Sequence, residues 1–172
     1  SCHSDHYLMF FSFKKNFSKQ KNKKLKILSG YNFRYRSIGK KSEESIIKYA
    51  NYFNFDYEID KTNKFERHFY WLKIKMIIEN LEKGTHDFLF WVDADAFFCR
   101  FENILDHVDK SKHLFVHNNF FKSSHKTKYK FVNYLTWAPN VGVLLVRNTN
   151  WSLNFFKNVW NKKKIFGSFL AR

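Results

Sequence analysis

The sequence predicts an α/β protein with a mostly parallel sheet flanked by helices, and three observations lead to that prediction. Patterns typical of strands and helices alternate along the chain, beginning with strand, helix, strand, helix, strand. The central run Phe88–Val92 is apolar throughout, which suits a strand buried on both faces of a parallel sheet. The chain has 172 residues and shows no internal repeat or linker, so we expect a single domain over residues 1–172, with a basic, irregular segment at residues 1–23.

The first strand is predicted at Leu25–Leu28 and ends in Ser29 and Gly30. Glycine at a strand end allows a sharp turn or a close approach of the backbone to a ligand. A helix is predicted over Ser42–Phe53, because Ser42 suits the N-cap position. Apolar side chains recur along this helix at the spacing of one buried face: Ile46, Ile47, Ala50 and Phe53.

The second strand, Phe55–Ile59, alternates apolar and acidic side chains, which is the period of a strand. The second helix is predicted over Phe65–Lys83 and stops at Gly84, a residue common at helix ends. Apolar residues at helical spacing indicate core positions, so three large side chains are expected to be structural: Trp71, Ile78 and Trp160.

Four further segments complete the predicted order. After the central strand we expect a short irregular or helical segment at Phe101–Val108 and then a strand at His113–His117. A polar surface excursion at Asn118–Thr136 and a last strand at Val141–Arg147 follow. A turn rich in helix-capping residues, Asn148–Ser152, then leads into a final helix at Leu153–Trp160.

The composition is strongly basic. Lys and Arg number 31 against 15 Asp and Glu, a net charge of +16, which attracts nucleotides, nucleic acid, acidic glycans or anionic membrane surfaces. The lysine-rich run Lys14–Lys26 is predicted to be a solvated loop. Cys2 and Cys99 give neither a disulfide framework nor a metal-ligand spacing. No apolar run approaches the roughly 20 residues of a membrane-spanning helix, and the localisation cannot be read from the sequence.

Two carboxylates, Asp93 and Asp95, follow the central apolar strand directly. In open α/β sheets, ligands bind beyond the carboxyl ends of the strands. Hard divalent cations such as Mn²⁺ and Mg²⁺ take carboxylate oxygens and leave positions for phosphate oxygens and water. The sequence therefore predicts a metal site at Asp93 and Asp95 rather than a pair of solvated turn residues.

Several motifs occur in an order that resembles one enzyme family. Trp91-Val-Asp-Ala-Asp-Ala96 is followed by Asn140-x-Gly142 and by Arg147-Asn148-x-x-Trp151-Ser-Leu153. These motifs come with others before and after them: Tyr31, Tyr49-Ala50, Phe55, Trp71-x-Lys73 and Trp160. Over residues 24–165 the chain is similar to glycosyltransferase family 34, which contains xyloglucan xylosyltransferases and yeast-type α-galactosyl- and mannosyltransferases. The resemblance implies the GT-A fold, a Rossmann-like sheet with a metal-binding Asp-x-Asp.

The resemblance also implies roles for individual residues. The donor would be a nucleoside-diphosphate sugar bound by Ser29, Gly30, Lys73 and Asp93, with Asp93 between the ribose and the metal. Asp95 would be the direct ligand of Mn²⁺ or Mg²⁺. The loop that borders donor sugar and acceptor would contain Asn140 and Gly142. The acceptor would be a glycan or other glycoconjugate, and the anomeric configuration would be retained. No residue is assigned as a catalytic nucleophile.

The chain also departs from the family pattern. The family continues with an Asp-Gln motif and a later His that completes the metal site, so we expect the domain to lack its C-terminal part. Val141 stands where the family has Thr. His113, His117 and His125 are expected to be ordinary strand or loop residues. In a eukaryote the resemblance would imply a Golgi or secretory membrane location, with membrane association through segments outside this chain. In another organism the location would be cytoplasmic or at the membrane periphery.

Two other classes of protein fit parts of the sequence. A phosphatase of the haloacid dehalogenase type also places Asp-x-Asp after an apolar strand, but that motif normally opens the chain, and here Phe97 follows Ala96. A basic, aromatic nucleic-acid-binding module would explain the charge, although not the paired carboxylates. Metal-dependent binding of a nucleoside diphosphate favours the glycosyltransferase, whereas salt-dependent binding of nucleic acid favours the binding module.

Overall fold

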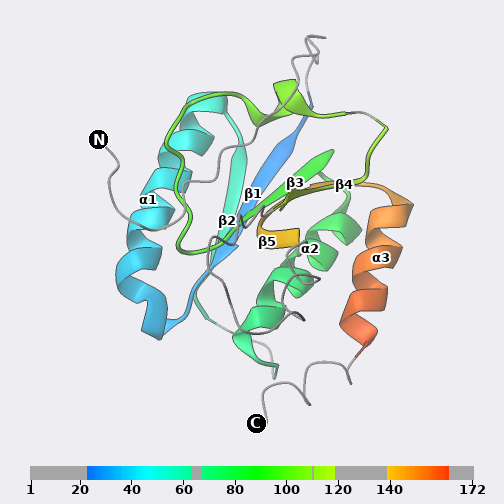
Figure 1. The fold of residues 1–172 in the computed structure, drawn as a ribbon, viewed down its shortest axis with the longest axis horizontal. Coiled ribbons are helices and arrows are strands. Elements are labelled where there is room, and N and C mark those ends of the chain that lie inside the picture. The colour runs from blue at the N-terminus through cyan, green and yellow to red at the C-terminus, as the bar shows by residue number, and fades with distance from the viewer. Residues whose placement is uncertain (1–22, 63–66, 110, 119–138, 163–172) are drawn as a thin grey trace, which may run out of the picture.

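A computed structural model describes residues 23–62, 67–109, 111–118 and 139–162, and it confirms the α/β class. The described chain forms eight main elements (Figure 1): β1 (Leu25–Gly30), α1 (Arg36–Phe53), β2 (Asp56–Asp60), α2 (Leu72–Lys83), β3 (Phe88–Val92), β4 (Leu114–Asn118), β5 (Pro139–Arg147) and α3 (Asn150–Asn161). Three short 3-10 turns lie between them, η1 (Phe33–Tyr35), η2 (Phe69–Trp71) and η3 (Ile104–His107).

The five strands form one mostly parallel sheet in the order β2-β1-β3-β5-β4. β1 pairs in parallel with both β2 and β3, whereas β5 pairs antiparallel with both β3 and β4. Four strands therefore point the same way and β5 points back. We call the side where β1, β2, β3 and β4 end, and where β5 begins, the carboxyl edge of the sheet.

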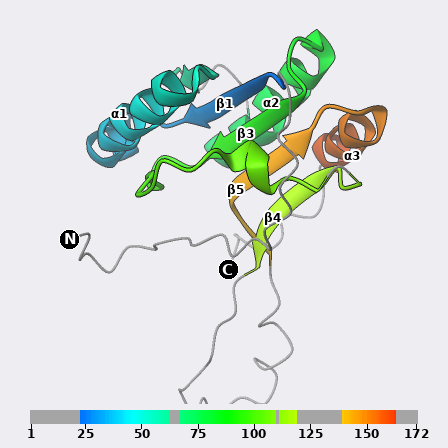
Figure 2. The same cartoon turned by 90° about the horizontal axis from the view of Figure 1, so that it is seen from above.

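Helices cover both faces of the sheet. Seen from above, α1 lies over one face, while α2 and α3 lie side by side over the other (Figure 2). The strand β3 serves both cores because its side chains alternate: Phe88, Phe90 and Val92 pack in the cluster with α1, and Leu89 and Trp91 pack in the cluster with α2 and α3. The prediction of a central strand buried on both faces is confirmed.

The helix α1 begins at Arg36, six residues before the predicted start. Asn32 caps η1 by accepting a hydrogen bond from Arg34 N. Because η1 follows β1 closely and continues directly into α1, the helix starts early. Ser42 lies within α1 with 1 % of its surface exposed, and its hydroxyl donates to the carbonyl oxygen of Ala96 over 2.7 Å. The predicted N-cap role of Ser42 is therefore wrong, because its hydroxyl has a tertiary partner.

The other two helices also differ from prediction in where they begin. α2 starts at Leu72, directly after η2, rather than at Phe65. α3 starts at Asn150 rather than Leu153, because the Thr149 side chain caps it by accepting a hydrogen bond from Ser152 N. Both helices keep the predicted apolar faces.

The three large side chains predicted to be structural have different surroundings. Ile78 is buried, with 5 % of its surface exposed. Trp71 and Trp160 are half-buried and pack edge to face with ring centres 5.8 Å apart. The Arg67 guanidinium lies 3.9 Å from the centre of the Trp160 ring and donates to the Trp160 carbonyl oxygen. These contacts join the start of α2 to the end of α3.

Some predicted features fall outside the described residues. Cys2, His125 and the lysines of residues 14–21 lie in segments of which the structure describes nothing. Within the described ranges, no helix combines the length and the apolar character that a membrane crossing needs.

Candidate functional site

The carboxyl edge of the sheet collects the residues that the sequence singled out. Ser29 and Gly30 end β1, Asp93 and Asp95 follow β3, and Asn140 and Gly142 lie at the beginning of β5. The start of α2 brings Lys73 to the same edge, since Leu72 packs against Gly30. Because β5 runs opposite to β3, its first residues stand beside the last residue of β3, with Val143 opposite Val92.

Contacts of both its side chain and its backbone fix Asp93 in place. Its carboxylate oxygen Oδ1 accepts a hydrogen bond from the Trp91 indole over 2.5 Å and lies 2.9 Å from Lys73 Nζ. Its amide donates to the Gly142 carbonyl oxygen over 2.8 Å, and its own carbonyl oxygen accepts from Ala96 N. Both side-chain contacts use Oδ1, so Oδ2 takes part in neither of them.

Lys73 joins three elements at this edge. Besides its ion pair with Asp93, its ammonium group donates to the Val141 carbonyl oxygen over 2.6 Å and lies 5.5 Å from the centre of the Trp91 ring. Only 13 % of the Lys73 side chain is exposed, against 36 % for Asp93. A cation so placed neutralises one carboxylate and ties α2 to the start of β5.

Asp95 contrasts with Asp93. It is exposed, and within the described ranges no hydrogen bond or ion pair engages its side chain. The described residues also hold no group of three or more His, Cys, Asp and Glu side chains that could bind a metal ion. Two carboxylates are too few to complete the shell of a divalent cation, so a cation held by Asp93 and Asp95 would need phosphate oxygens and water as its remaining ligands.

Gly30 is required by packing. A Cβ at this position would lie 2.5 Å from Leu72 Cδ2 and 2.9 Å from the carbonyl oxygen of Asp60. The absence of a side chain lets the start of α2 and the end of β2 close onto β1. Ser29 is buried beside it, with 2 % of its surface exposed, so its side chain offers little surface to a ligand.

A second charged group lies beyond the ends of β1 and β2. The Tyr31 hydroxyl donates to Glu43 Oε2 over 2.6 Å, and Lys61 Nζ lies 2.8 Å from Glu43 Oε1. Burial raises the pKa of Glu43, but the hydrogen bonds from Lys61 and Tyr31 outweigh burial and lower it below the ordinary value. Burial and the Glu43 carboxylate raise the pKa of Tyr31, so the pair is a carboxylate and a neutral phenol at neutral pH.

The chain that follows Asp95 is attached to α1. We call Ser42, Ser45 and Tyr49 the hydroxyl stripe, because their side chains bond to the backbone of residues 96–104. Ser42 donates to Ala96 O, Ser45 accepts from Phe98 N over 2.9 Å, and Tyr49 donates to Glu102 O while accepting from Ile104 N. Sequence reasoning missed this role, and the available signal was hydroxyl side chains at positions i, i+3 and i+7 of one helix.

At the start of β5, the Asn140 side chain bonds to the backbone of the same strand. Asn140 Oδ1 accepts a hydrogen bond from Gly142 N over 2.8 Å, and Asn140 stands opposite His117 in the ladder with β4. His117 is thus a strand residue, as predicted. His113 packs on Trp151 with ring centres 5.2 Å apart and lies 3.1 Å from the Thr149 hydroxyl, at the opposite edge of the sheet.

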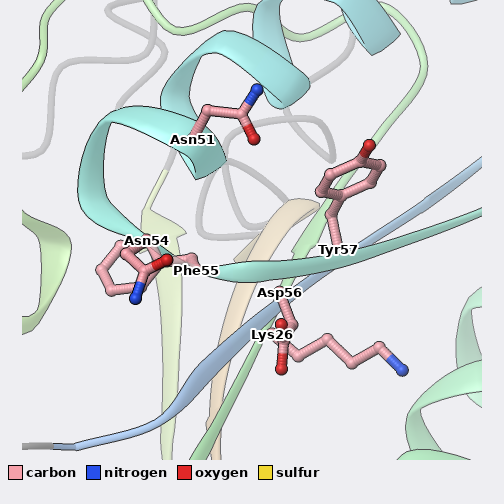
Figure 3. A pocket seen from close by; sticks show the side chains of 6 residues that line it. All are labelled: Lys26, Asn51, Asn54, Phe55, Asp56 and Tyr57. Carbon is pink, nitrogen blue, oxygen red and sulfur yellow. The ribbon is translucent and has the colours of Figure 1, made fainter.

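A separate hollow of about 440 Å³ lies at the turn between α1 and β2. Figure 3 shows its lining residues, Lys26, Asn51, Asn54, Phe55, Asp56 and Tyr57. The Lys26 side chain extends away from Asn51 and Asn54 towards α2, where its ammonium group contacts Glu58 and Asn80. Because this hollow adjoins the beginning of β2, it is not part of the site at the carboxyl edge.

Comparison with known proteins finds structural likeness without sequence likeness. No protein-family model matches the chain, and no curated protein matches it by sequence. Among solved structures, the chain is similar to a glycosyltransferase involved in the glycosylation of the major capsid of PBCV-1, with 18% identity, a TM-score of 0.60, and coverage of 84% of this chain and 70% of that one. It is also similar to the glycosyltransferase GlyE of Streptococcus pneumoniae TIGR4, with 14% identity, a TM-score of 0.51, and coverage of 80% of this chain and 38% of that one. At these identities the likeness shows a shared fold.

Proposed function

We propose that the protein is a glycosyltransferase that moves a hexose or pentose from a nucleoside-diphosphate sugar to a glycan or other glycoconjugate, with retention of anomeric configuration. In this proposal Asp95 and Asp93 hold Mn²⁺ or Mg²⁺ at the carboxyl edge of the sheet. The observation that carries it is the pairing of an unengaged Asp95 with a fixed Asp93, directly after the central strand of a fold that two glycosyltransferases share.

The likeness to two glycosyltransferases supports this proposal over the phosphatase and the nucleic-acid-binding module. The basic charge of the chain agrees with an anionic donor, since a nucleoside diphosphate carries negative charge that Lys and Arg attract. Lys73 is the described ammonium group closest to the acidic pair, at 2.9 Å from Asp93. Family 34 membership stays a prediction from the resemblance, as does the retention of configuration.

The residues at this edge have separate tasks in the proposed reaction. When the bond between sugar and diphosphate breaks, negative charge grows on the leaving diphosphate, and a bound divalent cation supplies the positive charge that stabilises it. Lys73 adds a fixed positive charge beside Asp93. Asp93 is held in one orientation by Trp91 and Lys73, so it needs no reorganisation when a nucleotide binds. Asn140 and Gly142 shape the rim next to it.

The test is a calorimetric titration of uridine and guanosine diphosphates, with and without Mn²⁺, on the full chain. We expect binding that depends on Mn²⁺, because the two carboxylates would otherwise repel the diphosphate. Asp95→Asn keeps the shape of the side chain and removes its charge, so it should abolish metal-dependent binding and leave the melting temperature unchanged or slightly higher. Asp93→Asn should weaken binding less than Asp95→Asn if Asp93 contacts the ribose as well as the metal.

A matched control is Asp106→Asn, which makes the same change at an exposed carboxylate in η3 and should leave nucleotide binding as in the wild type. Nucleotide binding that is equally strong without Mn²⁺, or wild-type affinity in both site variants, would contradict the proposal. If binding does depend on Mn²⁺, a comparison of sugar nucleotides should identify the donor, and NMR of the product would report whether configuration is retained.

A further inference from the structure

The segment after the acidic pair runs along α1 in a constant register. Ser42 bonds to residue 96, Ser45 to residue 98, and Tyr49 to residues 102 and 104, so the partners are separated by 53 to 55 positions throughout. The contacts are hydrogen bonds between hydroxyl groups and the backbone, and the hydroxyl groups donate two of them and accept the other two. One ring contact reinforces them, since the Tyr49 and Phe98 rings stack with centres 3.8 Å apart and planes 7° apart.

The hydroxyl stripe supplies hydrogen-bond partners to a segment without regular secondary structure. From Ala94 to Asn103 the chain belongs to no helix or strand, so no ladder satisfies its amide and carbonyl groups. Ser42 and Tyr49 are buried, and burial raises the pKa of Tyr49 to about 12, which keeps its hydroxyl protonated. Tyr49 can therefore donate to Glu102 O and accept from Ile104 N at the same time.

Asp95 sits between two anchors. On one side Asp93 is bonded through its amide to Gly142 and through its carboxylate to Trp91 and Lys73. On the other side Ala96 is bonded through its carbonyl oxygen to Ser42 and through its amide to Asp93 O. The Asp95 side chain itself has no bonding partner in the described chain, so the position of its carboxylate depends on how the backbone on either side is held.

We propose that the hydroxyl stripe of α1 holds the chain after Asp95 so that this carboxylate meets a cation-bound diphosphate in a fixed position. Ser42, Ser45 and Tyr49 are then positioning residues that act through the backbone and do not touch the ligand. This inference rests on the proposed function, because it concerns the affinity of the same site. It assigns to the face opposite α2 a part in binding that neither the motifs nor the structural likeness indicate.

The experiment removes single hydroxyl groups and measures binding of guanosine or uridine diphosphate with Mn²⁺. Tyr49→Phe keeps the ring that stacks on Phe98, and Ser45→Ala removes the acceptor for Phe98 N. Each should weaken metal-dependent nucleotide binding by about tenfold, as the loss of groups that orient metal ligands typically does. The titrations are done well below the melting temperature of every variant, so that all of the protein is folded.

Two variants serve as matched controls. Tyr52→Phe makes the same change on the same helix at an exposed tyrosine whose hydroxyl has no bonding partner in the described chain, and it should bind as the wild type does. Ser45→Thr keeps the hydroxyl and should restore most of the affinity lost in Ser45→Ala. Hydrogen exchange, followed by mass spectrometry, should rise in peptides covering residues 94–104 for Tyr49→Phe and Ser45→Ala, and remain unchanged for Tyr52→Phe.

The outcomes separate the inference from the function on which it rests. A wild-type protein that binds no nucleotide with Mn²⁺ would overturn the proposed function and the positioning role with it. Wild-type binding that persists undiminished in Tyr49→Phe and Ser45→Ala would overturn the positioning role alone, even if their melting temperatures fall. Unchanged exchange in residues 94–104 would likewise overturn it, because the hydroxyl groups would then not be holding this segment.

Discussion

Gly30 shows how a single residue at the strand end serves the fold. Its sequence position suggested a close approach to a ligand, and the structure shows a close approach of Leu72 and of the Asp60 backbone. A ligand role for Gly30 stays a prediction, whereas the packing role is visible. The two roles are compatible, because a residue without a side chain also lets its backbone come close to a ligand.

Gly30→Ala should destabilise the protein by about 1–3 kcal/mol, the usual cost of adding a methyl group to a packed site. The backbone oxygen at 2.9 Å cannot move aside as a flexible side chain could. Urea denaturation measures the change. Gly84→Asn is the control, since Gly84 has a left-handed backbone that Asn tolerates and has open space around it. Equal stabilities of Gly30→Ala and wild type would show that Leu72 and the Asp60 backbone can move to make room for the methyl group.

Glu58 makes stability depend on pH. Burial raises its pKa, but the hydrogen bond and charge of Lys26, with the Asn80 amide, outweigh burial and lower it below the ordinary 4.5. Because the folded pKa is lower than the unfolded one, the unfolded chain binds more protons, and the contribution is present above about pH 4.5 and lost as pH falls further. The Lys26 and Glu58 side chains are 16% and 36% exposed, so we expect about 1 kcal/mol or less.

The measurement is the difference in melting temperature between wild type and Glu58→Gln, followed from about pH 7 to about pH 3. The difference should be constant at neutral pH and shrink in acid, as the wild-type carboxylate gains its proton. Glu44→Gln, at an exposed glutamate of α1, should show no such trend. A difference that stays constant into acid would mean that Glu58 titrates normally in the folded protein.

At the scale of elements, Thr149 decides where the last helix begins. Its hydroxyl accepts from Ser152 N at 3.2 Å and lies 3.0 Å from the Ser152 hydroxyl, which in turn donates to Arg147 O. Thr149→Ala should cost about 1 kcal/mol in urea denaturation, the typical value for a lost cap. Thr149→Ser keeps the hydroxyl and should recover most of the loss. If both variants were equally unstable, the threonine methyl group and not the cap would be responsible.

The three helices illustrate which element features a sequence reveals. Their apolar faces follow from the spacing of Ile46, Ile78 and Phe156, and all three residues are buried. Their starting points depend on capping bonds, and a serine or threonine hydroxyl can serve either the helix or a distant backbone group. Thr149 caps its helix, while Ser42 bonds to Ala96, 54 residues away. The sequence does not distinguish these two uses of a hydroxyl group.

At the scale of the molecule, the carboxylate pair and its strand could be predicted, whereas the surroundings could not. An apolar run followed by two acids indicates a buried strand that ends in carboxylates, and Asp93 and Asp95 do follow the buried β3 at the carboxyl edge. Strand direction is not encoded in an apolar run, so the reversal of β5 was not foreseeable. That reversal places the Gly142 carbonyl oxygen on the Asp93 amide and the Val141 carbonyl oxygen on Lys73.

The charge of the whole chain leads to a prediction about the lysine-rich run. Replacing Lys14, Lys15, Lys19 and Lys21 with Ser should leave nucleotide affinity within a few-fold of wild type, because a solvated run contributes mainly screened, long-range attraction. Calorimetry at low and at physiological salt tests this, and any loss should be smaller at the higher salt. A large loss that persists at high salt would place the run at the donor site.

The insertion of β5 between two earlier strands constrains the order in which the protein can assemble. β4 has β5 as its ladder partner in the described sheet, and one edge of β3 is also completed only by β5. During synthesis, a chain that has reached residue 118 can form the local unit of β1, β2, β3, α1 and α2, but its β4 has no neighbour to join. One edge of the apolar strand β3 then stays unpaired until residues 139–147 emerge from the ribosome. Such long-range pairing is slow, and an open apolar strand edge favours association between chains, so aggregation competes most with folding in the interval before β5 is inserted.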